Sequence, residues 1–232
     1  MLDLRDRGGT APEELKALGD AVSQAVLAEH LGTERPDDAV LSEEAADDVR
    51  RLVCDRAWIV DPLDGTREYS EGRADWAVHV ALWRRDEDLV GAIALPAERL
   101  VLVSDPAPAL SERRPGPLRL AVSRTRPPQI ALDVAEELGF ELVAMGSAGY
   151  KIAAVVRGDV DAYVHAGGQY QWDSAAPVAV ALAAGVHASR LDGSPLRYNE
   201  PDVYLPDLVV SRPALASRLL DALDWLGRQC PR

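Results

Sequence analysis

The stretch that decides the fold is Trp58-Ile59-Val60-Asp61-Pro62-Leu63-Asp64-Gly65-Thr66. It cannot form a helix, because Pro62 lacks an N–H and Gly65 follows closely. The apolar run 58–60 is typical of a strand, so Asp61 and Asp64 should lie where a strand breaks into a turn. Two converging carboxylates repel each other unless a cation neutralises them, and Mg²⁺ prefers such oxygen ligands. The stretch therefore predicts a magnesium site.

The two residues after Asp64 add a possible anion site. Gly65 and Thr66 offer backbone N–H groups, which bind an anion if a helix starts there. Carboxylates for a metal beside amides for a phosphate predict metal-assisted hydrolysis of a phosphate ester. The same letters are also good turn chemistry, and by themselves they would more often form an ordinary loop.

Two further motifs favour the metal site over the ordinary loop. Upstream, the chain reads Leu41-Ser42-Glu43-Glu44, and downstream it reads Gln171-Trp172-Asp173-Ser174-Ala175-Ala176-Pro177. In this order and spacing, the three motifs resemble the inositol monophosphatase superfamily of Mg²⁺-dependent, lithium-sensitive phosphatases. The resemblance runs from about Lys16 to the C-terminal helix.

Composition narrows the classes of protein. The 232 residues are 47% hydrophobic, which is enough for one large domain or two small ones, and the net charge is −13. That charge argues against binding nucleic acid or a membrane surface, because both need a cationic surface. Two cysteines, Cys54 and Cys230, without close spacing favour neither a disulfide framework nor a zinc site and predict a cytoplasmic location. The first residues show no signal peptide, and the uncharged run 174–189 is too short to span a membrane.

The periodicity predicts two halves of different architecture. In residues 1–117 we expect a helix over 20–31 and an antiparallel meander of strands over 76–83, 90–95 and 100–103. The proline-rich stretch 106–117 is the candidate linker. In residues 118–232 we expect strands over 118–122, 142–144, 162–164, 187–191 and 208–210. Helices are expected over 129–138, 148–156, 173–184 and 213–226, the last with Ser211 as N-cap.

Strands that alternate with helices favour a mostly parallel sheet covered on both faces. The expected fold is thus α+β followed by α/β, with the site between the halves. It matches the layered αβαβα sandwich, of the inositol monophosphatase and fructose-bisphosphatase type, that the resemblance implies. The family begins with a long helix before a lysine-bearing loop, whereas only residues 1–7 precede that loop here. Either the start is late or the element is missing, and its loss would uncover apolar surface on the helix 20–31.

The resemblance implies a role for each acidic residue of the motifs. Glu43 would bind a first Mg²⁺, Asp61 would bridge two ions, and Asp64 would bind the second. The carbonyl of Leu63 would complete the first site, and Asp173 would close the second; its alternative role is a helix N-cap. Glu44 would be an outer partner or a solvated acid.

Two further positions concern the water and a third ion. The hydroxyl of Thr66 would hold the attacking water beside Glu43, which can take its proton, so no covalent intermediate is needed. Lys16 and Asp20 resemble a mobile loop that touches an outer, weaker metal, although Asp20 is equally suited to be a helix N-cap. The site would then hold two or three Mg²⁺ ions. His79 is interpreted as a packing histidine.

The substrate is less well determined. Expected contacts to it are Gly65, Thr66, Gly146, Ser147, Lys151, His165 and Gln169, with Arg67 as a further candidate. His165 stands where inositol phosphatases carry a glutamate, which weakens an inositol substrate. The motifs look closest to the bacterial 3′(2′),5′-bisphosphate nucleotidase branch, which removes the 3′-phosphate of adenosine 3′,5′-bisphosphate in sulfate assimilation.

Three readings stay open on the sequence. The first is this nucleotidase, and the second is an inositol or fructose-bisphosphate phosphatase. The third is a non-catalytic protein that binds a nucleotide or a cation. The expected partner is a small phosphorylated substrate, most readily a nucleotide bisphosphate, and the sequence leaves open whether the chain forms a homodimer.

Overall fold

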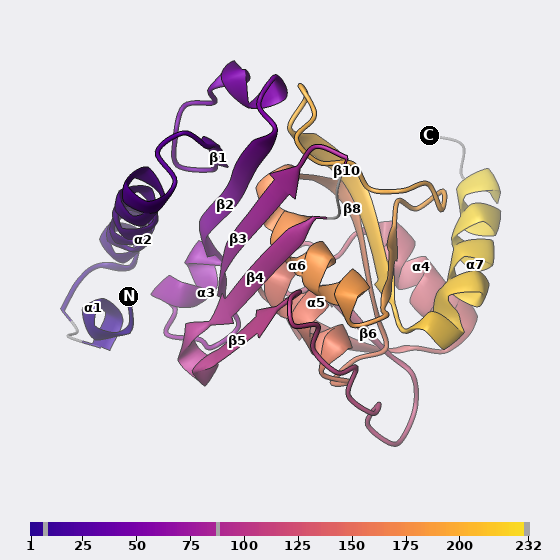
Figure 1. Cartoon of the computed structure of the whole chain (residues 1–232). Helices are drawn as coiled ribbons and strands as arrows, with labels where there is room; N and C mark the ends of the chain where they lie inside the picture. The colour runs from indigo at the N-terminus through magenta and orange to yellow at the C-terminus, as the bar shows by residue number, and fades with distance from the viewer. Residues whose placement is uncertain (7–8, 87–88, 230–232) are drawn as a thin grey trace.

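The computed structural model describes residues 1–6, 9–86 and 89–229, which form five layers (Figure 1). From one side to the other, the layers are a long helix, a first sheet, a pair of central helices, a second sheet and a pair of outer helices. The αβαβα sandwich is therefore confirmed. Cys230 lies outside the described residues, and Cys54 is a free thiol.

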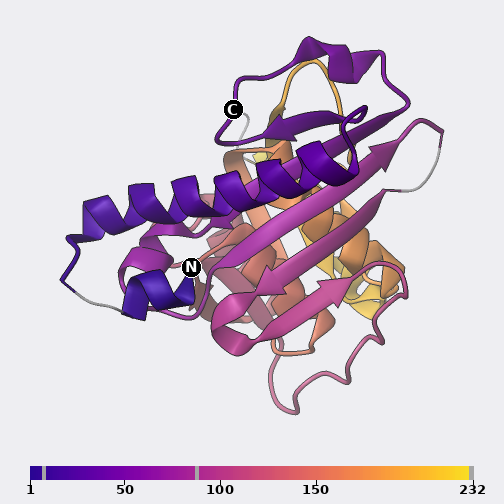
Figure 2. The same ribbon diagram turned by 60° about the vertical axis from the view of Figure 1, so that its left-hand side comes forward.

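The outermost helix, α2 (Pro12–Glu34), lies across the outer face of the first sheet (Figure 2). It begins eight residues before the predicted start, because Pro12 suits the first helical position and Glu13 and Glu14 favour the first turn. Lys16 and Asp20 are therefore inside a helix. The predicted mobile loop is wrong, and so is the N-cap role of Asp20.

The outward side of α2 is partly apolar. Leu18, Val22 and Val26 are spaced by four residues, share one face, and are 37%, 39% and 48% exposed. Before α2, the described residues include the short helix α1 (Leu2–Asp6).

The first sheet has the order β1-β2-β3-β4-β5. Its strands are β1 (Ala39–Ser42), β2 (Arg56–Asp64), β3 (Ala77–Arg84), β4 (Val90–Leu95) and β5 (Leu100–Val103). β1 is parallel to β2, β2 is antiparallel to β3, and β3 to β5 form the predicted antiparallel meander. Two short 3-10 turns, η1 (Val49–Leu52) and η2 (Pro96–Glu98), and the helix α3 (Thr66–Ser70) connect them.

The second sheet has the order β7-β6-β8-β10-β9. Its strands are β6 (Arg119–Ser123), β7 (Glu141–Met145), β8 (Ala162–Tyr170), β9 (His187–Ser189) and β10 (Tyr204–Ser211). β6 is parallel to β7 and β8, but β10 is antiparallel to β8 and β9. Because β10 opposes both of its neighbours, β6, β7, β8 and β9 all run in one direction, so the sheet is mostly parallel, as predicted, apart from β10. No helix connects β9 to β10, and the chain simply turns back there.

Helices cover both faces of the second sheet. The helices α5 (Ala148–Val156) and α6 (Gln171–Ala183) lie between the sheets, and α4 (Gln129–Leu138) and α7 (Ala216–Gln229) lie outside (Figure 1). Ser211 is the last residue of β10, and the turn η3 (Pro213–Leu215) precedes α7, so Ser211 is not its N-cap. None of the described helices is long and apolar enough to cross a membrane.

The two halves share one core. Ile59 and Ala81 of the first sheet belong to the same buried cluster as Ile152, Ala176 and Leu208 of the C-terminal half. The stretch 104–118 between β5 and β6 contains no helix or strand, which suits a boundary there. The division into domains 1–117 and 118–232 stays a prediction. Because the core is shared, neither half has a complete hydrophobic core of its own.

Candidate active site

The carboxylates of the decisive stretch lie at an irregularity of β2. Asp61 pairs with His79 and Asp64 with Ala77, so the register shifts between them, at the position of Pro62. Asp61 is 1% exposed. Its Oδ1 accepts a hydrogen bond of 3.0 Å from Leu63 N, whereas its Oδ2 has no hydrogen-bond partner among the described residues. A buried carboxylate oxygen without a donor is a group that a cation would satisfy.

Asp64 links the two halves. Its Oδ2 accepts hydrogen bonds from Ser147 Oγ at 2.5 Å and from Gly149 N at 2.8 Å. The same hydroxyl of Ser147 accepts from Tyr150 N and caps α5. Ser147, predicted as a substrate contact, therefore also fixes the Asp64 carboxylate.

His79 lies directly beside this pair. Its Nε2 is 3.4 Å from Asp64 Oδ2 and its Nδ1 is 3.9 Å from Asp61 Oδ2, and the imidazole is fully buried. The ligand atoms of the three residues lie within 4.8 Å of one another. Burial lowers the pKa of His79, so the ring is neutral at pH 7 and able to bind a metal or donate to a carboxylate. The ring is packed in the interior, as interpreted from the sequence, but that interpretation did not foresee its place beside the two carboxylates.

The other predicted acids come from separate elements. Glu43 follows β1, and its N–H donates to Val60 O at 3.3 Å. Asp173 is the third residue of α6, and its Oδ2 accepts a hydrogen bond of 2.6 Å from Tyr170 N. The N-cap is Tyr170, so the alternative role of Asp173 as N-cap is wrong. Asp20, on α2, is near enough to Glu44 for the two negative charges to repel each other.

The negative charges of these carboxylates repel one another, so several of the groups hold their protons more strongly than usual. Burial, followed by repulsion from neighbours such as Asp64, raises the pKa of Glu43 and of Asp173 to about 7. The pKa of Asp61 is raised well above its usual value for the same reasons. Burial and the nearby Glu44 raise the pKa of Asp20 to about 6. Such a set of oxygen ligands fits Mg²⁺, whose charge would relieve the repulsion.

A cavity of about 790 Å³ opens beside the acids. Glu43, Asp64 and Asp173 line it, together with every predicted substrate contact: Gly65, Thr66, Gly146, Ser147, Lys151, His165 and Gln169. The sequence motifs are thus brought to one place. Asp20, Asp61 and Leu63 are not part of its lining, and Asp61 and Leu63 are buried.

The turn after Asp64 is fixed by Gly65. Its φ of 91° is left-handed, and a Cβ there would lie 3.1 Å from Trp76 Cβ, so only glycine fits without strain. The helix α3 begins at the next residue, as the anion site requires. The Thr66 hydroxyl donates to Leu63 O at 3.2 Å, which places the two predicted functional groups side by side.

Three substrate candidates differ in their freedom to bind. Lys151 is buried, and its Nζ donates to the carbonyl groups of Ser147 at 2.7 Å and Gly146 at 3.2 Å. His165 Nε2 pairs with the Gly168 carbonyl at 3.0 Å. The Gln169 amide has no hydrogen-bond partner among the described residues. Lys151 therefore supports the Gly146–Ser147 turn as well as lining the cavity.

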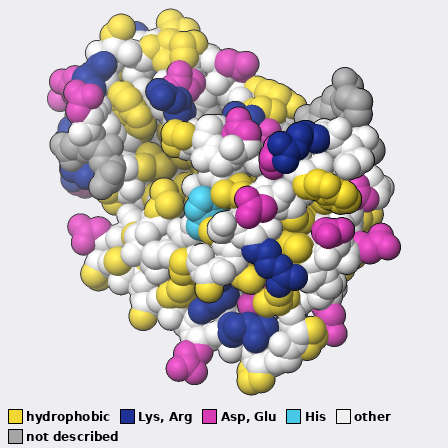
Figure 3. All heavy atoms as spheres, turned by 90° about the vertical axis from the view of Figure 1, so that its right-hand side faces the viewer, with side chains coloured by type: hydrophobic (Ala, Val, Ile, Leu, Met, Phe, Trp, Pro, Cys, Tyr) yellow, Lys and Arg dark blue, Asp and Glu magenta, His cyan; other side chains and the backbone are white. Residues whose placement is uncertain are grey.

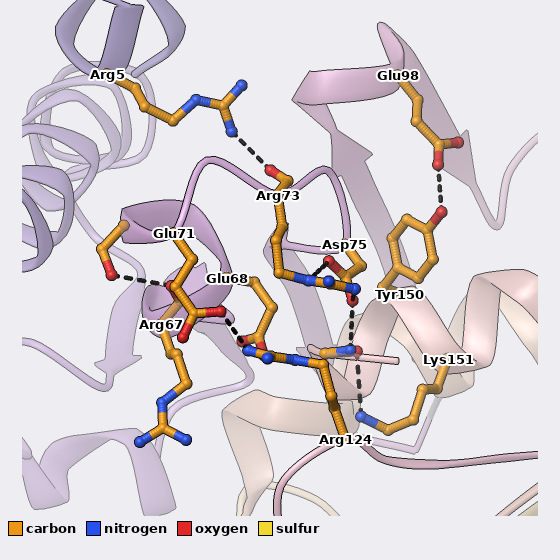
Figure 4. Close-up of polar contacts among 12 residues, drawn as sticks. Arg5, Arg67, Glu68, Glu71, Arg73, Asp75, Glu98, Arg124, Tyr150 and Lys151 are labelled. Carbon is orange, nitrogen blue, oxygen red and sulfur yellow. Dashed lines mark hydrogen bonds and ion pairs between the residues drawn. The ribbon is translucent and has the colours of Figure 1, made fainter. Parts of the chain in front are cut away.

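Sequence reasoning missed a second set of charges at this cavity. Arg124 pairs with Glu68 at 3.0 Å and with Glu71 at 2.6 Å, and Asp75 accepts from Gly146 N at 2.7 Å (Figure 4). A Cβ on Gly146 would lie 2.2 Å from Glu68 Cγ, so the halves touch closely here. The available signal was Ser123-Arg124-Thr125-Arg126 directly after an apolar strand, because ligands bind beyond the carboxyl ends of strands.

The raised pKa values predict that Mg²⁺ binding depends on pH. Carboxylates must lose their protons to bind a metal, and those of Glu43 and Asp173 do so only near pH 7. Mg²⁺ affinity should therefore fall by up to ~10²-fold from pH 8 to pH 6, if both groups release a proton. Calorimetric titration at both pH values measures it, and an equal affinity at the two would contradict these pKa values.

Comparisons with known proteins show the family of this chain. A family model described as the inositol monophosphatase family matches residues 4–224. A Mycobacterium tuberculosis protein named 3′-phosphoadenosine 5′-phosphate phosphatase is 54% identical over 228 residues, covering 93% of this chain and 84% of that protein. The Escherichia coli 3′(2′),5′-bisphosphate nucleotidase CysQ is 29% identical and covers 80% of each chain.

Solved structures show the same fold. Inositol monophosphatase II from Staphylococcus aureus superposes with a TM-score of 0.81 at 19% identity, covering 97% of this chain and 90% of that one. CysQ from Bacteroides thetaiotaomicron gives 0.79 at 24% identity and covers 91% of both chains. Since the family match spans nearly the whole chain and the layers agree with those of solved members, the protein belongs to the inositol monophosphatase family.

Proposed function

We propose that this protein is a Mg²⁺-dependent phosphomonoesterase that hydrolyses adenosine 3′,5′-bisphosphate to AMP and phosphate. The observation that carries the proposal is the 54% identity to mycobacterial proteins named for this phosphatase activity, over nearly the whole chain. The cluster of repelling carboxylates beside a large cavity supports it independently, because it has the ligands for the metal and the room for a nucleotide.

The residues at the site fit two or three Mg²⁺ ions. Asp61 would hold an ion through its buried Oδ2, which has no hydrogen-bond partner among the described residues. Glu43 and the Leu63 carbonyl would complete the first site, Asp64 and Asp173 the second, and Asp20 an outer third. Bound there, the ions would neutralise the phosphate oxygens, assist the leaving alkoxide and make water more acidic.

The chain itself would position the water and take its proton. The Thr66 hydroxyl already donates to Leu63 O, so its lone pairs remain to accept a hydrogen bond from water. Glu43, which lines the same cavity, would be suited to take the proton of the water, because an ionised carboxylate only accepts hydrogen bonds. The attack on phosphorus is in line, and no side chain is needed as a nucleophile.

The second phosphate has candidate partners of opposite charge. Arg67 and Arg126 line the cavity, and neither guanidinium is paired with an acid among the described residues. Arg124 is less available, since Glu68 and Glu71 already bind it. Free guanidinium groups bind phosphate in a bidentate way, so this pair supports a bisphosphate over a monophosphate substrate. Gln169 would face the adenosine part.

The charge of the protein surface agrees with a small acidic ligand that binds through metal ions. On the face that carries α4 and α7, basic side chains are mixed with acidic and apolar ones (Figure 3). With the net charge of −13, this favours no nucleic-acid partner. A role in sulfate assimilation, a cytoplasmic location and a homodimer remain proposals from the sequence and the resemblance.

The test is a panel of substrates with Mg²⁺. The proposal predicts a higher kcat/KM for adenosine 3′,5′-bisphosphate than for inositol phosphates or fructose 1,6-bisphosphate. A preference for inositol or fructose phosphates would favour the alternative phosphatases. Binding of the nucleotide without phosphate release would favour the non-catalytic protein.

Lithium is expected to inhibit at sub-millimolar to few-millimolar concentrations, on the family's behaviour. Li⁺ would occupy the second site, formed by Asp61, Asp64 and Asp173, without supplying the charge that the leaving alkoxide needs. Initial rates across a lithium titration at low Mg²⁺ measure the effect, with KCl as the ionic-strength control. Rates unchanged by lithium would argue against this assignment of the second site.

A further inference from the structure

A buried arginine joins the two halves of the chain. Arg51 is 0% exposed and lies in η1, in the segment 43–55 that follows Glu43. Its guanidinium binds Asp47 through two hydrogen bonds, Nε to Oδ1 at 2.7 Å and Nη2 to Oδ2 at 2.9 Å. Its remaining nitrogen, Nη1, donates across to the C-terminal half, to Asn199 Oδ1 at 3.0 Å and Glu200 O at 2.9 Å.

Asn199 also donates hydrogen bonds, one back to Arg51 and one to Gln171. Its Nδ2 donates to Arg51 O at 3.0 Å, so the pair is reciprocal. Its backbone N–H donates to Gln171 Oε1 at 2.6 Å, and Gln171 Nε2 donates to Asp202 O at 2.9 Å. Asn199 and Gln171 are 7% and 1% exposed. A continuous buried network therefore runs from Arg51 to Gln171.

The ends of this network lie close in sequence to two carboxylates of the site. Gln171 is the first residue of α6, and Asp173 is the third. At the other end, Glu43 begins the segment that Arg51 holds. Within the described part of the chain, the hydrogen bonds from residues 44–53 to the C-terminal half all involve Arg51. Nothing else of this kind fixes that segment relative to α6.

A buried guanidinium needs this many partners, because an unpaired buried charge is strongly unfavourable. The network is therefore rigid only while it is complete. Residues that hold metal ligands in place typically change metal affinity 10–100-fold when removed, since ligands must sit within fractions of an ångström. The Arg51 network is placed to act in this way on Glu43 and Asp173, which belong to different halves.

We propose that Arg51, through Asn199 and Gln171, is a positioning residue that holds Glu43 at the correct distance from Asp173 and so sets the affinity for Mg²⁺. The proposal rests on the proposed function, in which these two carboxylates bind the ions. Arg51 does not line the cavity, so its effect reaches the substrate only through the carboxylates.

Two substitutions test the network from its two sides. Arg51→Lys keeps the positive charge but loses the planar fork that binds Asp47 and Asn199 together. Asn199→Gly removes the side chain, and glycine tolerates the φ of 58° at this position without strain. The matched control is Arg190→Lys, since Arg190 binds Asp207 through two hydrogen bonds of 2.8 and 2.7 Å entirely within the C-terminal half.

The measurements are calorimetric Mg²⁺ binding, melting temperature in EDTA, and kcat as a function of Mg²⁺ concentration. Both network variants should bind Mg²⁺ about tenfold or more weakly, with kcat recovering at high Mg²⁺. Arg190→Lys should lower the melting temperature similarly and leave Mg²⁺ affinity unchanged. The double variant should be little worse than the worse single one, because both residues belong to one network.

The opposite results are equally distinct. Mg²⁺ affinity within twofold of wild type in both network variants would overturn the positioning role, as would an equal loss in the Arg190 control. If the Arg51→Lys variant does not fold, the Mg²⁺ affinity of the Asn199→Gly variant alone tests the positioning role. A wild type that binds Mg²⁺ but releases no phosphate contradicts the proposed function only, because calorimetry still decides the role of Arg51. A wild type that binds no Mg²⁺ overturns both.

Discussion

Replacing Asp61 by asparagine is expected to reduce phosphate release by more than ~10²-fold while leaving the fold intact. Removal of a residue that merely supports a metal ligand changes affinity 10–100-fold, and Asp61 would bind two ions directly. Its Oδ2 has no donor among the described residues, so no structural hydrogen bond to that atom is lost. The change removes only the charge and one ligand for each ion.

The same variant should be more stable than wild type without metal. The pKa of the Asp61 carboxyl is higher in the folded than in the unfolded protein. As the pH rises above the unfolded pKa, the unfolded chain loses this proton more readily, so the free energy of unfolding decreases. A neutral amide removes that cost, and the melting temperature in EDTA at pH 8 should rise. Mg²⁺ should then add less stability to the variant than to wild type.

Asp161→Asn is the matched control for Asp61→Asn. Asp161 is also buried, but Arg113 and Arg119 N satisfy its carboxylate. This variant should lose stability in EDTA and keep its activity at a temperature where it is folded. Wild-type turnover of Asp61→Asn at saturating Mg²⁺ would refute the bridging role.

Thr66→Ala is expected to lower kcat by ~10²-fold or more with little change in nucleotide affinity. A contact that positions water acts mainly in the transition state, so its loss affects turnover more than binding. The carboxylates and the backbone amides of Gly65 and Thr66 remain in place. Single-turnover hydrolysis and calorimetric binding, both with adenosine 3′,5′-bisphosphate and Mg²⁺, separate the two effects.

Thr66→Ser is the control for this change. It keeps the hydroxyl that donates to Leu63 O and should keep most of the activity. If alanine and serine give the same rate as wild type, Thr66 has no part in the mechanism, although the protein would remain an enzyme. Equal losses in both would point to the methyl group and to packing instead.

Local sequence patterns predicted the helices and strands well where the secondary-structure propensity of a segment agrees with its packing. The strands 90–95 and 100–103 have the expected bounds, since short charged connections leave only an antiparallel meander. The acids Glu43, Asp64 and Asp173 meet at one cavity as the motifs indicate. Their roles as metal ligands remain predictions.

The errors have physical causes that single motifs do not reveal. Asp20 was expected to be a helix N-cap because aspartate favours that position, but it lies inside α2, directly after Gly19, where a Cβ would lie 2.8 Å from Leu63 and Tyr69. Glycine is there to let the helix approach, and Pro12 marks the true start. The antiparallel β10 was missed because its direction depends on a helix-free connection rather than on its own residues.

The contacts of Arg51 and of His79 could not be predicted from the sequence, for a different reason. Arg51 is 148 residues from Asn199, and a charged residue in a polar segment reads as solvated surface. His79 lies on an apolar strand, and only the register of β3 against β2 brings it to Asp61. Contacts set by pairing between distant segments do not appear in local sequence patterns.

The central claim is tested most directly by single-turnover phosphate release from adenosine 3′,5′-bisphosphate, measured with the wild-type protein in Mg²⁺ and again in EDTA. We expect AMP and one phosphate per nucleotide in Mg²⁺, and no release above background in EDTA. Calorimetric binding of the nucleotide, measured in parallel, shows that the site is filled. A wild type that binds the nucleotide in Mg²⁺ and releases no phosphate, or that releases it equally in EDTA, would contradict a metal-dependent nucleotidase.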